Sequence, residues 1–195
     1  THRGPDGDAM GSSLALYNLL INLDHEVTVI TPNDYASFLH WMPGNDNVIQ
    51  YNGNEELAKS ITEKAELIIM LDFNSKNRLD NYSDTVFNLN TYKILIDHHQ
   101  DPDMEIADLI FSDPDSCSTA QLLFEILDSI DLKDKINQDI AECLYTGIMT
   151  DTGSFKYSST TSTTHNIIAQ LINMGARSSM IHDLVYDCSS ADRMK

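Results

Sequence analysis

Residues 67–72 and 93–99 read LIIMLD and KILIDHH, and these two segments decide the fold. Their apolar parts, LIIML and KILI, are short and continuous, which is typical of strands buried on both faces of a parallel sheet. Each run leads directly to polar groups, Asp72 in the first segment and Asp97 and His98 in the second. Ligands of open α/β sheets bind beyond the carboxyl ends of the strands, so we expect these side chains to share one crevice.

The rest of the chain alternates between strand and helix patterns. Further strands are expected at 25–30, 48–51, 109–111 and, in the run CLYTGIMT, at 143–150. Helices are expected after a cap at Ser12 or Ser13 and at 36–42, 55–64, 76–82, 119–130 and 163–174. This order predicts an α/β fold with a doubly wound, mostly parallel sheet and helices on both faces. We expect one domain over residues 1–187, and residues 188–195 to begin a linker.

The charge of the chain argues against several kinds of partner. With 12 basic and 30 acidic residues, the formal net charge is −18, which disfavours long nucleic acid and anionic membrane surfaces. No apolar run approaches the ~18 residues of a membrane span. Cys117, Cys143 and Cys188 show no C-x-x-C spacing, so we expect reduced thiols and a cytoplasmic protein. A substrate that carries phosphate would need a local cation.

The first twelve residues, THRGPDGDAMGS, place His2, Asp6 and Asp8 on one loop. Such a ligand loop normally leaves the end of a strand, so we expect that the first strand precedes Thr1, in a longer protein. Each motif alone also has an ordinary structural explanation, because PDGD could form a turn and Asp72 could cap the next helix. Agreement of several motifs at one sheet edge favours a metal site.

The residue types of this site indicate which ions it would hold. Carboxylates with two imidazoles suit Mn²⁺, or Mg²⁺ as a substitute, better than a structural zinc site rich in thiolates. Six candidate ligands exceed what one ion needs when it also holds water and substrate, so we expect two ions. Two ions ~3.5–4 Å apart can share a carboxylate, generate hydroxide and hold both oxygens of an in-line phosphoryl displacement. The pattern predicts hydrolysis of phosphoesters or phosphoanhydrides.

These motifs, taken in order, resemble the four motifs of the DHH phosphoesterases: His2-x-x-Pro5-Asp6-Gly7-Asp8, Asp72, Asp97-His98-His99 and the Asp151 of TGIMTDTGSF. The resemblance covers nearly the whole chain. It is closest to the bacterial branch of oligoribonucleases and 3'-phosphoadenosine 5'-phosphate phosphatases, in which a DHH catalytic domain is followed by a smaller DHHA1 domain. That second domain, with its Gly-Gly-Gly-His signature, is not found in this sequence and is expected in cis.

The resemblance implies a division of the ligands between two Mn²⁺ ions. One ion would be held by His2, Asp6 and Asp72, and the second by Asp8, Asp72, His98 and Asp151. Asp72 would therefore bridge the two ions.

Five further residues are candidates for the substrate side of the site. By the resemblance, His99 would contact the scissile phosphate or the leaving group, and Asp97 would orient the histidine pair. Arg78, six residues after Asp72, could reach a phosphate with its forked donors. Ser118 and Thr119, at a helix start, could offer amides or hydroxyls to an anion.

The leading hypothesis is a manganese-dependent phosphohydrolase of short nucleotides. Its substrates would be very short RNA oligomers (nano-RNA), linear or cyclic dinucleotides, or 3'-phosphoadenosine 5'-phosphate. A pyrophosphatase or exopolyphosphatase of the same superfamily is an alternative, although an acidic chain offers a poor groove for polyanions. A nucleotide-binding module without catalysis is a third reading. A homodimer is a further expectation.

Overall fold

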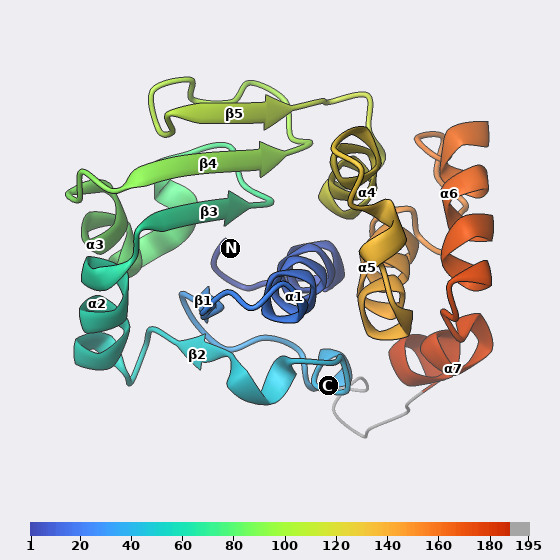
Figure 1. The fold of residues 1–195 in the computed structure, drawn as a ribbon, viewed down its shortest axis with the longest axis horizontal. Coiled ribbons are helices and arrows are strands. Elements are labelled where there is room, and N and C mark those ends of the chain that lie inside the picture. Colours follow the sequence, from blue (N-terminus) through green and yellow to red (C-terminus); the bar gives the residue numbers. More distant parts are fainter. Residues whose placement is uncertain (188–195) are drawn as a thin grey trace.

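The computed structural model describes residues 1–187 as an α/β fold whose strands form two parallel ladders (Figure 1). The larger ladder has the order β3-β4-β5, from Leu67–Leu71, Tyr92–Asp97 and Leu109–Ser112. The smaller pairs β1, Ile30–Thr31, with β2, Ile49–Gln50. The expected linker, residues 188–195, lies outside the described residues, and so does Cys188.

Helices cover both faces of the larger ladder, which confirms the expected α/β architecture. The helices are α1 (Gly7–Asn22), α2 (Glu55–Lys64), α3 (Ser83–Phe87), α4 (Thr119–Ser129), α5 (Gln138–Asp151), α6 (Ser162–Asn173) and α7 (Ser178–His182). Met70 and Leu95 point to one face, where they share a core with Val86 of α3. Leu71 and Ile96 point to the other face and join the main core with α1, α4 and α5. Figure 1 shows α2 and α3 on the side of the sheet away from α4 and α5.

The register of the larger ladder brings its strand ends to one edge. Leu71 pairs with Ile96, and Asp97 pairs with Ser112 of β5. The residues that follow β3 and β4 therefore emerge next to each other. Figure 1 shows the three strands ending on the side of the sheet where α4 lies, so the residues that follow β3 and β4 face that side.

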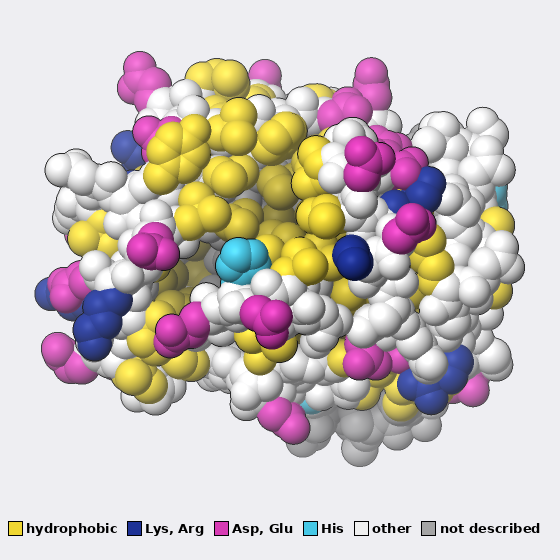
Figure 2. Space-filling model, in the orientation of Figure 1, with side chains coloured by type: hydrophobic (Ala, Val, Ile, Leu, Met, Phe, Trp, Pro, Cys, Tyr) yellow, Lys and Arg dark blue, Asp and Glu magenta, His cyan; other side chains and the backbone are white. Residues whose placement is uncertain are grey.

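Part of the sheet keeps apolar side chains in solvent. Leu67, Tyr92, Leu109 and Phe111 are each more than a third exposed, and strand alternation puts them on one face. Figure 2 shows hydrophobic side chains gathered over the region of β3, β4 and β5. The helices within residues 1–187 therefore leave this face incompletely covered. None of those helices is long and apolar enough to cross a membrane.

The start of the first helix differs from the sequence prediction. The helix begins at Gly7, not after Ser12 or Ser13, because Asp6 is its N-cap and accepts the N–H groups of Asp8 and Ala9. Ser12 lies inside the helix, where its hydroxyl donates to the Asp8 carbonyl.

Two predicted strands also differ. The run CLYTGIMT is not a strand but part of helix α5, which is buried from Ile140 to Met149. A short apolar run does not distinguish a buried strand from a buried helix, and neighbouring helices exclude water here from every side. Of the segment 25–30, only Ile30 belongs to a strand. In the described residues the backbone of this segment meets a partner strand only near its end, where the Val29 carbonyl accepts the Ile49 N–H.

Close contact between α1 and α5 depends on glycine. A Cβ added at Gly11 would lie 2.6 Å from the carbonyl oxygen of Cys143 and 2.8 Å from the nitrogen of Gly147. A Cβ added at Gly147 would lie 2.6 Å from the Cβ of Ala120 and 2.9 Å from Oδ1 of Asp8. These distances are below ordinary van der Waals contact, so the two backbones approach as closely as glycine allows. The approach sets Asp8, on α1, against α4 and α5.

Candidate metal centre

The N-terminal loop brings three predicted ligands to the strand ends. His2 and Asp8 are buried, whereas the Asp6 side chain is 59 % exposed. One oxygen of Asp6 caps α1, and its other oxygen lies 3.9 Å from Nε2 of His2. The helix cap and the candidate ligand set therefore use the same carboxylate.

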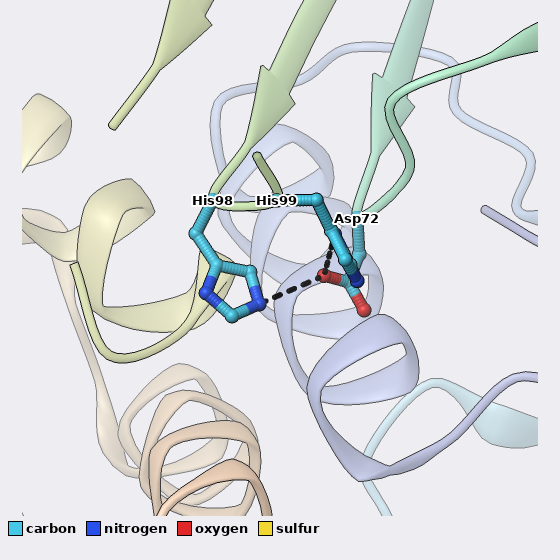
Figure 3. Close-up of side chains that lie close together, drawn as sticks. All are labelled: Asp72, His98 and His99. Atoms are coloured by element: carbon cyan, nitrogen blue, oxygen red, sulfur yellow. Dashed lines mark ion pairs between the residues drawn. The ribbon is translucent and has the colours of Figure 1, made fainter. Parts of the chain in front are cut away.

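Asp72 lies at the centre of the site. Its Oδ2 is 3.5 Å from Nε2 of His2, and its Oδ1 is 3.7 Å from Nε2 of His98 and 3.8 Å from Nδ1 of His99. Figure 3 shows both histidines of the loop after β4 directed at this carboxylate. The backbone of Asp72 has φ +67°, a left-handed conformation that is uncommon outside glycine and that concentrates at functional sites.

The remaining predicted ligand, Asp151, is the last residue of α5. Its Oδ2 lies 3.4 Å from Nε2 of His98, which is also 3.8 Å from Oδ2 of Asp8. The chain then turns sharply, with φ values of +56°, +60° and +66° at Gly153, Ser154 and Phe155. The turn thus follows directly on the helix end that carries Asp151.

Three groups of potential ligands result, and the third shares one residue with each of the other two. Ligand atoms of His2, Asp6 and Asp72 lie within 4.8 Å of one another, and so do those of Asp8, His98 and Asp151. Asp72 also groups with His98 and His99. The structure thus brings together all six residues proposed to bind metal, and their role as ligands stays a prediction.

The histidines show that the site fits a cation. Nδ1 of His2 lies 2.8 Å from the Arg3 carbonyl, and Nδ1 of His98 lies 3.3 Å from the Ser116 carbonyl. A carbonyl only accepts, so each Nδ1 donates a hydrogen bond to it and each ring directs its Nε2 at carboxylates. The His2 Nε2 is buried without a hydrogen-bond partner. A bound cation would be stabilised by imidazole nitrogens and carboxylates that converge in this way.

The carboxylates influence one another's ionisation. Burial, and then the charges of Asp72 and Asp151, raise the pKa of Asp8 well above its usual range. Burial also raises the pKa of Asp151 to about 6, helped by Asp72 and Asp6 and opposed by His98. Burial opposes the charge of Asp72 too, but His2 and Thr119 outweigh it and lower its pKa. Asp72 is therefore the carboxylate that stays charged when the others take up protons.

The raised pKa of Asp151 predicts two effects of rising pH. The stability of the metal-free protein should fall, and metal binding should become stronger. Between about pH 4 and pH 6 the folded protein keeps a proton on Asp151 that the unfolded chain loses, so this stabilising contribution is lost as pH rises through about 6. Mn²⁺ competes with the same proton, so the increase in melting temperature on adding Mn²⁺ should grow over that window. Thermal melts with and without Mn²⁺ measure both effects. The same increase at pH 5 and pH 7 would contradict the prediction.

The residues predicted to act on the substrate differ in how far their contacts leave them free for that role. Nδ1 of His99 lies 2.7 Å from Oδ1 of the buried Asp97, which orients the ring. That hydrogen bond raises the pKa of His99, and the positive charge of Arg78 opposes the rise, so the guanidinium acts on this ring.

The geometry does not support substrate binding by Ser118 and Thr119. Both residues are fully buried. The Ser118 side chain caps α4 by accepting the Gln121 N–H, and both donors of Thr119 bind carboxylates of the site. A sequence pattern shows a helix start, but it does not show that the amides there already have a partner.

A parallel α/β sheet with carboxylate and imidazole groups converging at its strand ends is the arrangement expected of an α/β metal-dependent hydrolase domain. The chain belongs to the DHH family: the family described as "DHH family, N-terminal domain" matches residues 1–148.

Proteins of known sequence and structure support the same assignment. The "Bifunctional oligoribonuclease and PAP phosphatase NrnA" of Thermus thermophilus is 30% identical over 184 residues, which are 94% of this chain and 51% of that protein. The Bacillus subtilis protein of the same name is 28% identical over 190 residues, 95% of this chain and 55% of that protein. The chain thus spans about half the length of these relatives.

A solved structure shows the same fold. The crystal structure of an "exopolyphosphatase-related protein" from Bacteroides fragilis has a TM-score of 0.96 and 39% sequence identity. The match covers 99% of this chain and 56% of the other.

Proposed function

We propose that this chain carries the two-metal centre of a Mn²⁺-dependent phosphohydrolase that cleaves short nucleotide substrates. The observation that carries the proposal is a pair of ligand groups in which the two oxygens of Asp72 face one histidine of each group, His2 and His98. The names of the relatives favour very short RNA oligomers, dinucleotides and 3'-phosphoadenosine 5'-phosphate as substrates. The proposal assigns His2, Asp6 and Asp72 to one ion, and Asp8, Asp72, His98 and Asp151 to the other.

The chain's own residues would position the substrate and donate a proton to its leaving oxygen. Bound divalent ions would supply Lewis acidity and activate water. Asp97 holds Nδ1–H of His99, so a proton at Nε2 can pass to the leaving oxygen, and the raised pKa of this half-buried ring favours the protonated form. Arg78 would hold a phosphate oxygen next to that ring.

The proposal also includes the length of the substrate, the cellular compartment, a second domain and the oligomeric state. The net charge of −18 favours short substrates over long nucleic acid. We propose a cytoplasmic protein, a DHHA1 domain in cis that recognises the base, and a homodimer. The free thiols of Cys117 and Cys143 suit a reducing compartment.

Metal removal gives the direct test of the proposal. The full-length protein with Mn²⁺ should release mononucleotides from a 5'-phosphorylated RNA dinucleotide and phosphate from 3'-phosphoadenosine 5'-phosphate. Dialysis against EDTA should abolish both reactions, and added Mn²⁺ should restore them, with Mg²⁺ as a weaker substitute. Full activity in EDTA would refute the two-metal mechanism.

The same assay separates the alternatives. Pyrophosphate and polyphosphate chains test the second enzyme class, which the name of the Bacteroides fragilis protein favours. Cleavage of these substrates alone would reassign the enzyme to that class. Nucleotide binding without turnover of any substrate would instead support a binding module.

A further inference from the structure

The N-terminus of α4 is in contact with two of the proposed metal ligands. The backbone N–H of Thr119 donates to Oδ2 of Asp8 at 2.6 Å, and the N–H of Ala120 donates to Oδ1 at 2.9 Å. Both oxygens of Asp8 therefore accept an amide of the first helical turn, where the helix dipole favours a negative charge. A lone pair remains on each oxygen for a metal ion.

The hydroxyl of Thr119 reaches a second carboxylate. It donates to Oδ1 of Asp72 at 2.8 Å, the oxygen that faces His98 and His99. Thr119 is thus bonded at the same time to Asp8, 111 positions earlier, and to Asp72, 47 positions earlier. One residue thus helps to fix the relative position of two segments that are far apart in the sequence.

The surroundings of Thr119 leave it little freedom. The residue has no exposed surface, and the preceding Ser118 is held as N-cap of α4, with its carbonyl accepting the Ser116 hydroxyl. On the far side of Asp8, Gly147 lies so close that an added Cβ would meet Oδ1 at 2.9 Å. Asp8 and Thr119 cannot move apart without disturbing the packing of α4 and α5.

We infer that Thr119 is a positioning residue for the bridging carboxylate. Its hydroxyl holds Asp72 in the rotation in which Oδ1 faces His98 and Oδ2 faces His2, so that one carboxylate serves both ligand groups. Without this donor, the carboxylate can rotate about the Cβ–Cγ bond toward one group. The inference rests on the proposed two-metal function.

Two substitutions at this position isolate the hydroxyl. Thr119→Val removes it but keeps the backbone amide on Asp8 and nearly the same volume, whereas Thr119→Ser keeps it. Loss of a partner behind a metal ligand typically costs 10–100-fold in metal affinity, so we expect Thr119→Val to bind Mn²⁺ at least about tenfold more weakly. Thr119→Ser should stay within about threefold of wild type. Isothermal titration with Mn²⁺ on the full-length protein measures this without reference to turnover.

Thr62→Val is the matched control. Thr62 is a buried threonine of α2 whose hydroxyl bonds the Ala58 carbonyl and the hydroxyl of Tyr82, both remote from the site. Thr62→Val should lower the melting temperature and leave Mn²⁺ affinity unchanged. If Thr119→Val does not fold, Thr119→Ala serves as the second variant without a hydroxyl.

The outcomes distinguish this role from the proposed function. Wild-type Mn²⁺ affinity in Thr119→Val, or an equal loss in Thr119→Ser, would overturn the positioning role alone. A normal Mn²⁺ affinity with a raised KM would return Thr119 to substrate binding. Wild-type protein that binds no Mn²⁺ would overturn the role together with the two-metal function.

Discussion

Asp72→Asn is expected to lower kcat by at least about a hundredfold, because the charge of the carboxylate proposed to bridge the two ions is lost. Asparagine keeps the shape of the side chain and tolerates the left-handed backbone at this position. The variant should therefore fold, and the loss should be one of catalysis. Steady-state turnover of a 5'-phosphorylated RNA dinucleotide with Mn²⁺ measures it.

The same substitution has two opposing effects on the stability of the metal-free protein: it removes a charge that His2 and Thr119 stabilise, and it relieves repulsion. Asp72 is one of the charges that raise the pKa values of Asp8 and Asp151, so its removal relieves repulsion among buried carboxylates. The increase in melting temperature on adding Mn²⁺ should disappear. Asp139→Asn, at an exposed position of α5, is the control and should keep activity and the Mn²⁺ effect. Wild-type turnover in Asp72→Asn would show that the carboxylate does not bridge two ions.

Gly11→Ala is expected to destabilise the fold by about 2–3 kcal/mol, because the new methyl group has no space between α1 and α5. Its Cβ would lie 2.6 Å from the Cys143 carbonyl oxygen, which belongs to a helix backbone and cannot rotate away. For a domain of this size, the loss corresponds to a fall in melting temperature of roughly 5–10 °C.

Whether Gly11→Ala lowers or raises the free energy of unfolding distinguishes a close helix contact from an open helical position. At an open helical position, replacing glycine by alanine stabilises a helix by about 1 kcal/mol. Urea unfolding of Gly11→Ala and wild type gives the difference in the free energy of unfolding. A variant as stable as wild type would show that α1 and α5 are packed less closely than described.

The residues that follow the buried strands could be placed from the sequence because two signals coincide there. LIIML and KILI are too short and too apolar for surface helices, and the sheet rule sends whatever follows them to one edge. Asp72, His98 and His99 therefore could be brought together before any coordinates were known. The sequence also places Asp151 next to His98, although the strand predicted at 143–150 is part of helix α5.

The missed features depend on contacts between distant segments. Asp6 is both helix cap and candidate ligand, and the serine pair at 12–13 gives an equally good cap signal six and seven residues later. The roles of Gly11 and Gly147 become clear only when α1 and α5 are seen in contact. Thr119 appeared to have free donors, because no local pattern shows that Asp8 and Asp72 already occupy them.

The left-handed backbone of Asp72 also limits how this site can be lost in evolution. At φ +67°, most side chains cost conformational energy, whereas aspartate, asparagine and glycine are tolerated. Of these, asparagine alone keeps the side-chain volume while removing the charge, and a single base change converts an aspartate codon into an asparagine codon. One base change at this codon can therefore remove the charge while the backbone conformation is kept.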